Sequence, residues 1–405
     1  MKEMQIYYFS TALSDDIYNS IVRDCNSFKP TFSGVGFDRN VAVGLSSYAD
    51  VQGVSLYPIP SWPKYKSLLK KSEQFQIENF KCFIPSMIDL PVLKEFSYYF
   101  RTKRFIEKHM NESKNTIIVI SGLYRSLLRP AQYLKKKYGL KICAIVPDLP
   151  ELMITYRKDY SKLRSFLNKL DVKKSQRYRA CVDGFIFLSK YMDEEVNQKK
   201  RPAVIVDGLT DIASFPYRND TETKKFVLYA GKVSSTFGVD KLVEAFLQSN
   251  LCDSVQLYIC GDGDYAGELK EIVAENPSIL YFGSVPHHKV LQMEVQASLL
   301  VDPRPSNMEI VKMSFPSKII EYMASGTPVL TTNLPCFSEE YREYQYRIDD
   351  ESVDGIKIAL ENVFSLSDLE RNTKGKNAKQ FIMENKTMEK QCETIMTFLK
   401  RIEGK

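Results

Sequence analysis

Lys318 and Glu321 are the residues of this 405-residue chain whose types and spacing point most directly to chemistry. They fall at a predicted helix start, because Pro316 and Ser317 suit the first positions, with Ser317 able to cap free N–H groups. Gly326 suits the position just past the helix end. The N–H groups of such a start bind phosphate, and a carboxylate one turn further in accepts hydrogen bonds from a sugar diol. Phosphate and ribose together indicate a nucleotide; the alternative is an ordinary amphipathic helix with solvated Lys and Glu.

A polar loop around Lys232 is the second candidate. The run Phe226-Val-Leu-Tyr-Ala230 predicts a strand that ends at Gly231, and a helix is predicted to begin near Gly238. Ligands of open α/β sheets bind beyond the carboxyl ends of the strands, so this loop is expected to face a cleft. A solvated loop lysine is the alternative for Lys232.

The segment 314–332 resembles the signature of family 4 of the GT-B glycosyltransferases. That family shows Glu, seven residues, a second Glu, and then a turn with Gly-x-Pro-Val. Glu321 matches the second glutamate, and residues 326–329 match the turn. Met313 stands where the first glutamate is expected, and Glu309, four residues earlier, is a candidate replacement.

The Lys232 loop resembles the G-R-L-x-x-x-K-G element of the same family, whose Arg and Lys hold the donor diphosphate. Aligned on the two glycines, Lys232 takes the Arg position and Phe237 takes the Lys position. The resemblance implies that Lys232 binds the diphosphate and that Lys318 supplies the missing charge. With Glu321 as the ribose ligand, these are the residues expected to carry catalysis.

Three more segments resemble donor-binding elements of that family. Residues 259–265 resemble its Gly-x-Gly element, residues 281–286 its F-x-G-x-V turn beside the base, and residues 301–307 a loop whose arginine makes bidentate bonds. Plain loops and a structural ion pair are the alternatives. The expected donor-binding residues are Gly231, Lys232, Gly261, Gly263, Val285, Arg304, Pro316, Ser317, Lys318 and Glu321.

Asp262-Gly263-Asp264 also spells Asp-x-Asp, the metal motif of the other large glycosyltransferase fold, GT-A. The surroundings resemble GT-B, which usually needs no divalent metal, and negative charge is favoured at a helix start. Only three histidines exist, which disfavours a His-based zinc site. We therefore expect no metal and no cofactor other than the nucleotide diphosphate sugar that serves as donor.

Four residues of the first half are expected on the acceptor side. Gly34 and Gly36 lie in a predicted loop ahead of a helical stretch over residues 40–48, and this loop resembles the glycine loop at the acceptor cleft of GT-B enzymes. Asp148 and Glu151 follow a predicted strand directly and could bind acceptor hydroxyls. Tight-turn carboxylates are the alternative.

Short apolar runs alternate with longer periodic ones, which is typical of α/β domains with parallel sheets. Strands are predicted over 117–120, 142–146, 184–188 and 203–206, and then over 226–230, 255–259, 279–282, 299–301 and 328–330. Residues 207–224 indicate a linker, and 365–402 are predicted helical with a break near Asn385. The periodicity predicts two α/β lobes.

The resemblance implies how the lobes are used. Residues 1–210 are expected to form an acceptor-side Rossmann-like lobe and 211–385 a nucleotide-sugar lobe, with a cleft between them. Residues 386–405 are expected to form a C-terminal helix that crosses back to the first lobe. This is the GT-B plan.

Composition excludes several classes of protein. The chain start has charges and too short an apolar run for a signal peptide, and no run approaches the roughly 18 apolar residues of a membrane span. Eight cysteines without a C-x-x-C pair indicate buried thiols in a reducing compartment, so a cytoplasmic location is expected. A net charge of +6 is no nucleic-acid signature by itself.

Nine Lys and Arg side chains lie between residues 157 and 179, with apolar residues among them at near-helical spacing. This pattern is typical of a basic amphipathic segment on an anionic membrane, here the inner face. The alternative is a solvated basic face whose apolar side packs in the core.

Together these features predict a glycosyltransferase that moves a sugar from a nucleotide diphosphate sugar to a glycan or lipid-linked acceptor in surface polysaccharide or glycoconjugate biosynthesis. Family membership implies retention of the anomeric configuration. The alternatives are an inverting transferase, with Asp148 as the best base, a nucleotide-sugar epimerase, or a non-catalytic GT-B partner, which Met313 and Phe237 leave open. A nicotinamide dehydrogenase is disfavoured because no G-x-G-x-x-G follows a strand of the first lobe.

Overall fold

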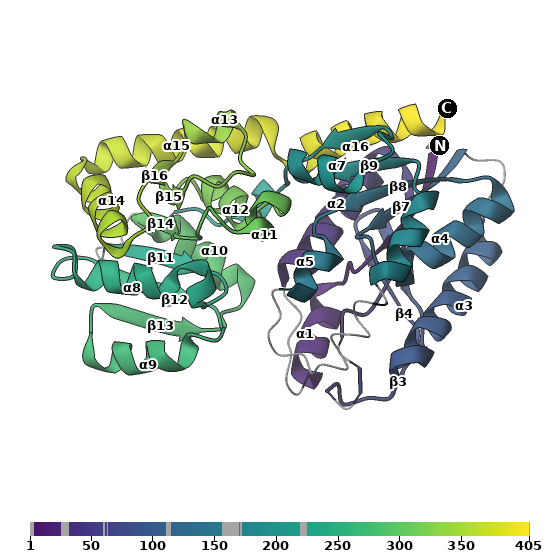
Figure 1. The fold of residues 1–405 in the computed structure, drawn as a ribbon, viewed down its shortest axis with the longest axis horizontal. Coiled ribbons are helices and arrows are strands. Elements are labelled where there is room, and N and C mark those ends of the chain that lie inside the picture. Colours follow the sequence, from purple (N-terminus) through teal and green to yellow (C-terminus); the bar gives the residue numbers. More distant parts are fainter. Residues whose placement is uncertain are drawn as a thin grey trace. The chain divides into compact units, whose positions relative to one another are not determined.

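The computed structural model describes residues 4–25, 32–59, 61–62, 64–110, 115–155, 170, 172–218 and 225–404. The chain folds into two compact units (Figure 1). Unit 1 comprises Met1–Leu209 together with Met388–Lys405, and unit 2 comprises Thr210–Thr387. Each unit has its own sheet and its own hydrophobic core.

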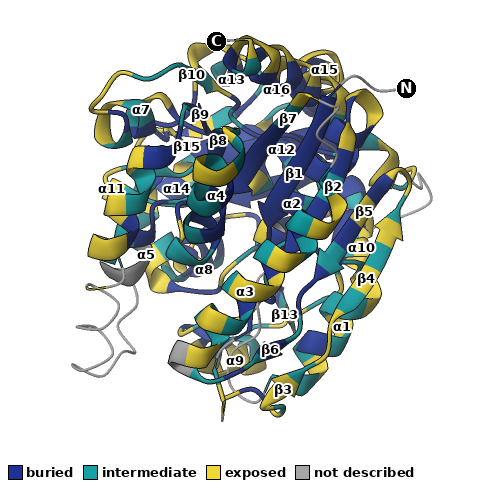
Figure 2. Ribbon diagram, turned by 90° about the vertical axis from the view of Figure 1, so that its right-hand side faces the viewer, coloured by how far each residue is buried: buried dark blue, intermediate teal, exposed yellow. Residues whose placement is uncertain are grey.

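The sheet of unit 1 has the strand order β10-β9-β8-β7-β1-β2-β5-β4 in the described part of the chain. Its strands run parallel except for β4, which pairs antiparallel with β5. Figure 2 shows the central strands as buried. The strands are β1 (Met4–Ser10), β2 (Asp50–Ser55), β4 (Glu73–Ile77), β5 (Phe80–Ile84), β7 (Asn115–Ser121), β8 (Lys141–Val146), β9 (Gly184–Phe187) and β10 (Ala203–Ile205), and a separate pair is formed by β3 (Leu69–Lys70) and β6 (Met87–Ile88).

The last helix of the chain packs inside unit 1 against α2. The Cys392 thiol lies 3.7 Å from the Val41 carbonyl oxygen, and a Cβ on Gly44 would lie only 2.5 Å from that sulfur. The close approach therefore needs a glycine in α2. The helices of unit 1 are α1 (Asp15–Asp24), α2 (Phe32–Tyr48), α3 (Pro91–His109), α4 (Arg125–Tyr138), α5 (Pro150–Thr155), α7 (Lys190–Val196) and α16 (Met388–Glu403).

The sheet of unit 2 is parallel throughout its described strands, in the order β13-β12-β11-β14-β15-β16. These are β11 (Phe226–Ala230), β12 (Gln256–Cys260), β13 (Ile279–Gly283), β14 (Leu299–Asp302), β15 (Val329–Thr332) and β16 (Tyr346–Ile348). The helices are α8 (Val239–Leu247), α9 (Ala266–Glu275), α10 (His287–Gln296), α11 (Glu309–Met313), α12 (Ser317–Ser325), α13 (Glu339–Arg342), α14 (Val353–Ser365) and α15 (Asp368–Asn385).

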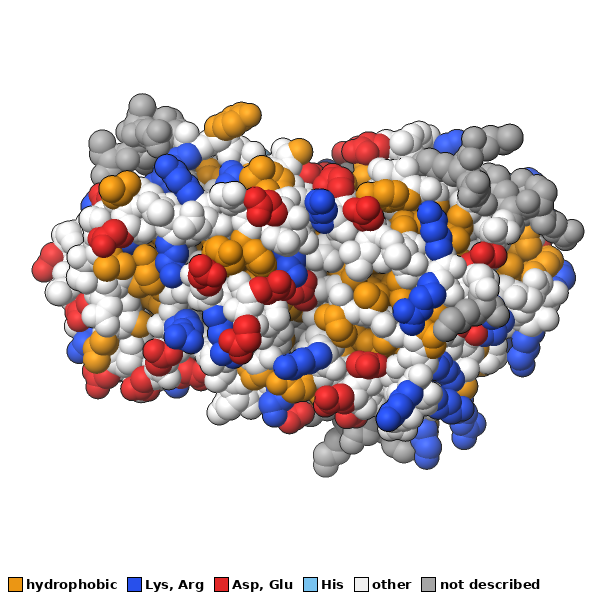
Figure 3. Space-filling view, turned by 90° about the horizontal axis from the view of Figure 1, so that it is seen from above, with side chains coloured by type: hydrophobic (Ala, Val, Ile, Leu, Met, Phe, Trp, Pro, Cys, Tyr) orange, Lys and Arg blue, Asp and Glu red, His pale blue; other side chains and the backbone are white. Residues whose placement is uncertain are grey.

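The surface seen in Figure 3 intermixes hydrophobic, basic and acidic side chains. Among the described helices, none is long and apolar enough to cross a membrane.

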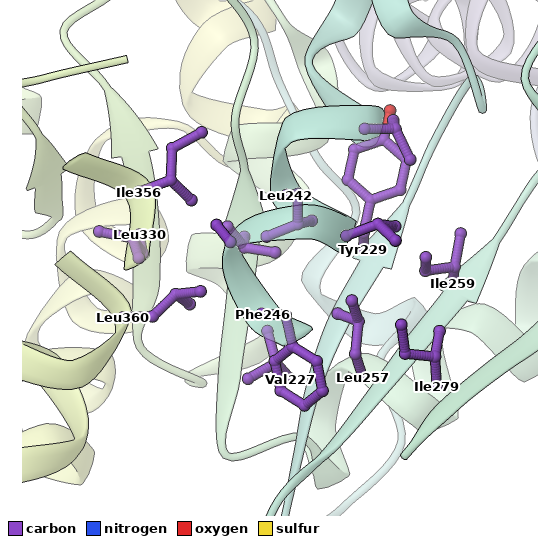
Figure 4. Close-up of a cluster of buried hydrophobic side chains, with 14 of the residues drawn as sticks. Val227, Tyr229, Leu242, Phe246, Leu257, Ile259, Ile279, Leu330, Ile356 and Leu360 are labelled. Carbon is purple, nitrogen blue, oxygen red and sulfur yellow. The ribbon is translucent and has the colours of Figure 1, made fainter. Parts of the chain in front are cut away.

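The core of unit 2 joins the sheet to helices on its face (Figure 4). Val227 and Leu257, on the neighbouring strands β11 and β12, pack in one cluster with Phe246 of α8 and Leu360 of α14. Burying each such side chain stabilises the fold by about 1.5–3 kcal/mol. The predicted α/β class with two Rossmann-like lobes is confirmed.

Candidate functional site

The candidate donor residues of unit 2 gather at one edge of its sheet. Gly231 follows β11, Gly261 follows β12, Val285 follows β13 and Arg304 follows β14. All four strands are parallel, so these residues share the carboxyl edge. Ligands of such sheets bind at this edge.

Two glycine-containing loops at this edge are joined through their backbones. The Gly231 N–H donates to the Cys260 carbonyl (3.0 Å), and the Val233 N–H donates to the Asp262 carbonyl (3.1 Å). Gly261 has a positive φ of 132°, and a Cβ there would lie 1.7 Å from the Gly231 oxygen. A Cβ on Gly263 would lie 2.0 Å from the Val233 oxygen. The two glycines are thus required by the packing of one loop on the other.

Phe237 brings two predicted phosphate ligands together. It belongs to a short 3-10 helix (Ser235–Phe237), and its ring lies 5.8 Å from the Lys232 ammonium and 5.0 Å from the Arg304 guanidinium. Arg304 also lies 3.7 Å from Asp302. Phe237 stands where a second lysine is expected. It adds no positive charge of its own, but its ring holds the Lys232 and Arg304 cations by cation–π contact.

Lys318 and Glu321 of α12 are ion-paired with each other and extend into a larger cluster. The Lys318 ammonium lies 3.3 Å from Glu294 Oε1, and His287 Nε2 lies 2.8 Å from Glu321 Oε2. His287 and Glu294 both belong to α10, where a spacing of seven residues puts them on one face. These four residues form what we call the α10–α12 cluster.

Burial and charge set the protonation of this cluster. Glu294 is 0 % exposed, and burial together with the negative charge of Glu321 raises its pKa well above the usual value. Burial alone would raise the pKa of Glu321 and lower that of Lys318, but their mutual attraction outweighs it, so the pKa of Glu321 is lowered and that of Lys318 is raised. These shifts favour a protonated Glu294 beside the Lys318–Glu321 ion pair.

Tyr322 fixes α12 on the sheet. The Ala230 N–H, at the end of β11, donates to the Tyr322 hydroxyl (2.7 Å), and that hydroxyl donates back to the Ala230 carbonyl (3.3 Å). The α10–α12 cluster is thereby anchored next to the loop that carries Lys232.

The start of α12 differs from the prediction in one respect. Pro316 occupies the N-cap position and Ser317 is the first helical residue, so the expected cap by the Ser317 side chain is wrong. Proline offers no side-chain acceptor, and α12 has no side-chain cap hydrogen bond at this position. The helix end at Gly326, with φ of 83°, is as predicted.

Two motif positions make contacts within their own segments. Asp262 accepts a hydrogen bond from the Gly263 N–H (2.8 Å) in the turn before α9. Glu309 is exposed and ion-paired with Lys312 (3.6 Å). Among the described residues, no group of three or more His, Cys, Asp or Glu is arranged to hold a metal ion.

Unit 2 also has a groove at the opposite edge of its sheet. Lys225 and Val255, which precede β11 and β12, line it together with Arg371. Because the candidate donor residues follow the strands instead of preceding them, this groove lies away from them.

The acceptor-side predictions for unit 1 have mixed outcomes. Gly34 and Gly36 lie inside the first turns of α2, so the loop predicted there is wrong. Asp148 follows β8, as its position predicts. Glu151, in α5, is ion-paired with Arg179 (2.7 Å), and although burial alone would raise its pKa, hydrogen bonding to Arg179 lowers it.

A buried carboxylate explains why α2 begins so early. Asp38 accepts hydrogen bonds from the Thr11 N–H and hydroxyl (both 2.7 Å), just after β1, and from the hydroxyl of Ser121 at the end of β7. These bonds tie the N-terminal half of α2 to two strand ends. They favour a helix across the two glycines despite their low helix propensity.

The sequence analysis does not identify Asp38, Glu294 or His287. For Glu294 a signal exists, because a glutamate between Leu291 and Val295 interrupts the apolar face of a helix. Most of the basic segment 157–179, namely residues 157–169 and 171, lies outside the described residues.

The chain is similar in sequence to one family model and in structure to several solved proteins. Residues 213–381 match the family model "Glycosyl transferases group 1". None of the curated protein sequences shows a match. Sucrose-phosphate synthase from Thermosynechococcus elongatus is similar in structure, with a TM-score of 0.71, 13% identity, and coverage of 98% of this chain and 99% of that chain.

The chain has the GT-B glycosyltransferase fold. Two further structures agree with this assignment at low identity. WaaG, a glycosyltransferase involved in lipopolysaccharide biosynthesis, has a TM-score of 0.61 and 13% identity, with 97% of this chain and 98% of that chain covered. The catalytic domain of starch synthase IV from Arabidopsis thaliana, bound to ADP and acarbose, has a TM-score of 0.65 and 9% identity, with both chains covered fully. The group 1 match supports sugar transfer as the class of reaction.

Proposed function

We propose that the chain transfers a glycosyl unit, with retention, from a nucleotide diphosphate sugar to a glycan or lipid-linked acceptor. The observation that carries the proposal is the α10–α12 cluster at the start of α12, on the carboxyl edge of the sheet and beside the loop of Lys232. Cations, the first N–H groups of α12 and a carboxylate meet there, which suits a diphosphate joined to a ribose. Starch synthase IV, of the same fold, binds ADP.

In the reaction, the bond between the anomeric carbon and the donor phosphate breaks, and a bond from the acceptor oxygen to that carbon forms. The acceptor proton passes to the departing diphosphate, so no side chain has to act as a strong base. Lys232, Lys318 and the N–H groups at Ser317 would stabilise the charge that develops on the leaving group. Arg304, held beside Lys232 by Phe237, would add to this field.

Glu321 would hold the ribose. An ionised carboxylate has about four acceptor sites, and in the structure Glu321 bonds Lys318 through one oxygen, His287 through the other, and also Glu294. About one acceptor site therefore remains for a ribose hydroxyl. Because its pKa is raised, Glu294 can hold Lys318 without adding a second full negative charge next to a diphosphate.

The finer parts of the proposal follow the family resemblance. They are membership of family 4, a role in surface polysaccharide or glycoconjugate biosynthesis, a cytoplasmic location, and contact with the inner membrane face through residues 157–179. Retention distinguishes this reading from an inverting transferase that uses Asp148 as base.

An assay with a panel of radiolabelled nucleotide diphosphate sugars tests the proposal, with and without sugar and lipid-linked acceptors. We expect release of a nucleoside diphosphate with one donor, faster with the right acceptor, and a product whose anomeric proton coupling shows retention. A product with inverted anomeric configuration, made by the wild type but not by Asp148→Asn, would favour an inverting transferase. Tight donor binding without any turnover would favour a non-catalytic partner and would overturn the proposal.

A further inference from the structure

Helix α3 of unit 1 carries a stripe of exposed side chains that no role above uses. Leu93, Phe96 and Phe100 are 45%, 42% and 57% exposed, and Arg104 and Lys108 continue the stripe at helical spacing. An exposed apolar patch next to basic residues on a soluble unit marks an interaction surface. Figure 2 shows α3 with exposed residues along its length.

The neighbouring helix α4 extends this surface. The Arg129 guanidinium lies 5.1 Å from the Phe96 ring and 4.4 Å from the Tyr99 ring, and the Lys103 ammonium lies 4.1 Å from the Tyr133 ring. The two helices therefore present aromatic rings interleaved with cations. We call this the α3–α4 surface.

Charge on the α3–α4 surface is strongly one-sided. Each helix contributes five Lys and Arg residues, while their only acidic residues are Glu95 and Glu107 of α3. Both are partnered by α4: Glu95 with Arg125 (3.1 Å) and Glu107 with Lys137 (2.7 Å). Ten basic and two acidic residues give the two helices a charge of +8. Asp89, which pairs with Lys94 (3.2 Å), and Asp183, which pairs with Lys135 (2.6 Å), reduce it to +6, equal to the charge of the whole chain.

More exposed apolar side chains lie at the N-terminal end of α3. The backbone N–H of Trp62 donates to the carbonyl of Asp89 (3.1 Å), which lies two residues before α3. Trp62 is 50% exposed. Leu69, exposed in β3, pairs with Ile88 of β6. Apolar groups thus continue past the helix start.

We propose that the α3–α4 surface binds an anionic lipid bilayer. Exposed Phe, Leu and Trp side chains enter the acyl boundary, while Lys and Arg meet anionic headgroups. A second copy of the chain fits less well, because a two-fold contact would bring two surfaces of +6 together. This inference does not depend on the sugar-transfer reaction or on residues 157–179.

Sedimentation of the full chain with vesicles of phosphatidylcholine, alone or mixed with phosphatidylglycerol, tests the proposal. We expect binding to the mixed vesicles that weakens with salt. Arg104→Gln with Lys108→Gln should reduce the partition coefficient by up to roughly 25-fold, at about fivefold for each residue. Phe96→Ser with Phe100→Ser should reduce it by about fivefold for each ring, since each is half exposed.

Matched controls lie in unit 2. Lys270→Gln with Lys376→Gln removes two exposed charges, and Leu369→Ser with Met383→Ser removes two exposed apolar side chains. All four variants alter exposed positions, and circular dichroism checks that they remain folded. Equal binding by the α3–α4 variants and wild type would overturn the proposal. So would failure of the wild type to bind the mixed vesicles, which would favour an acidic protein as the partner instead.

Discussion

At the residue scale, the raised pKa of Glu294 is the feature on which the proposed donor site depends. A wholly buried carboxylate that kept its charge beside Glu321 would place two negative charges where a diphosphate must bind. Burial and the charge of Glu321 both raise the pKa of Glu294, which prevents this. With Glu294 protonated, the charges of Lys318 and Glu321 balance, so the cluster adds no net negative charge at the start of α12.

Glu294→Gln tests this state through the pH dependence of stability. Because the folded pKa is raised, Glu294 stabilises the fold fully below its unfolded pKa of about 4.3, and this stabilisation is lost as pH rises toward the folded pKa. The wild type should lose up to about 1.4 kcal/mol of unfolding free energy per pH unit relative to the variant. Urea unfolding of both proteins from about pH 5 to about pH 8 measures the difference. Parallel curves would mean that Glu294 is charged in the folded protein.

Glu321→Gln should weaken nucleoside diphosphate binding while the fold is kept. A charge-assisted hydrogen bond is worth about 1.5–3 kcal/mol, so affinity should fall by roughly 10- to 150-fold. Isothermal titration calorimetry measures the change. Glu309→Gln is the matched control, because Glu309 is exposed and outside the α10–α12 cluster. Unchanged affinity in Glu321→Gln would remove this residue from the site.

At the element scale, the loops after β11 and β12 position Lys232 jointly. Gly261→Ala should lower the unfolding free energy by more than about 2 kcal/mol, because the position has a positive φ and the added Cβ would clash with the Gly231 oxygen. Gly267→Ala, on α9 with open space around it, should be neutral or stabilising by up to about 1 kcal/mol. Thermal unfolding compares them, and equal destabilisation would contradict the packing role of Gly261.

The sequence predicts five of the six described strands of unit 2 within a residue or two, because strands such as β11 are largely apolar. It does not predict β16, whose three residues include Arg347. It does not predict β1, whose buried run contains Gln5, Tyr7 and Tyr8. Tyr7 and Tyr8 can be buried because their hydroxyls donate to the His109 carbonyl (2.9 Å) and to Asp38 (3.3 Å), partners far away in the sequence. The early start of α2 is not predicted for the same reason, because Asp38 bonds Thr11 and Ser121, which are distant in the sequence.

Prediction of the candidate site likewise depends on whether a residue's partners are near it in the sequence. Lys232, Lys318, Glu321 and Arg304 follow from motifs that are local in the sequence. The positions of Lys232 and Arg304 after strand ends follow from the parallel sheet, whereas Lys318 and Glu321 lie in α12. Glu294 and His287 lie 24 or more residues from their partners in α12, so local spacing gives no indication of their contacts.

At the scale of the whole molecule, the proposed chemistry stabilises the leaving diphosphate with protein cations and helix N–H groups. Transfer should therefore survive excess EDTA, and Asp262→Asn should leave turnover within about twofold, since Asp262 accepts a hydrogen bond in a turn. Initial rates with and without the chelator give the answer. A complete loss of activity that Mn²⁺ or Mg²⁺ restores would favour the Asp-x-Asp metal site instead.

The central claim is that the carboxyl edge of the unit 2 sheet binds a nucleoside diphosphate. Thermal unfolding of the full chain, with each common nucleoside diphosphate and each free nucleoside, tests it most directly, since a ligand of the folded state raises the midpoint. We predict that one diphosphate raises the midpoint clearly and that its nucleoside does so far less. Lys232→Ala and Lys318→Ala should each reduce the diphosphate effect and leave the nucleoside effect unchanged. No shift with any diphosphate, or equal shifts in wild type and both variants, would contradict the account.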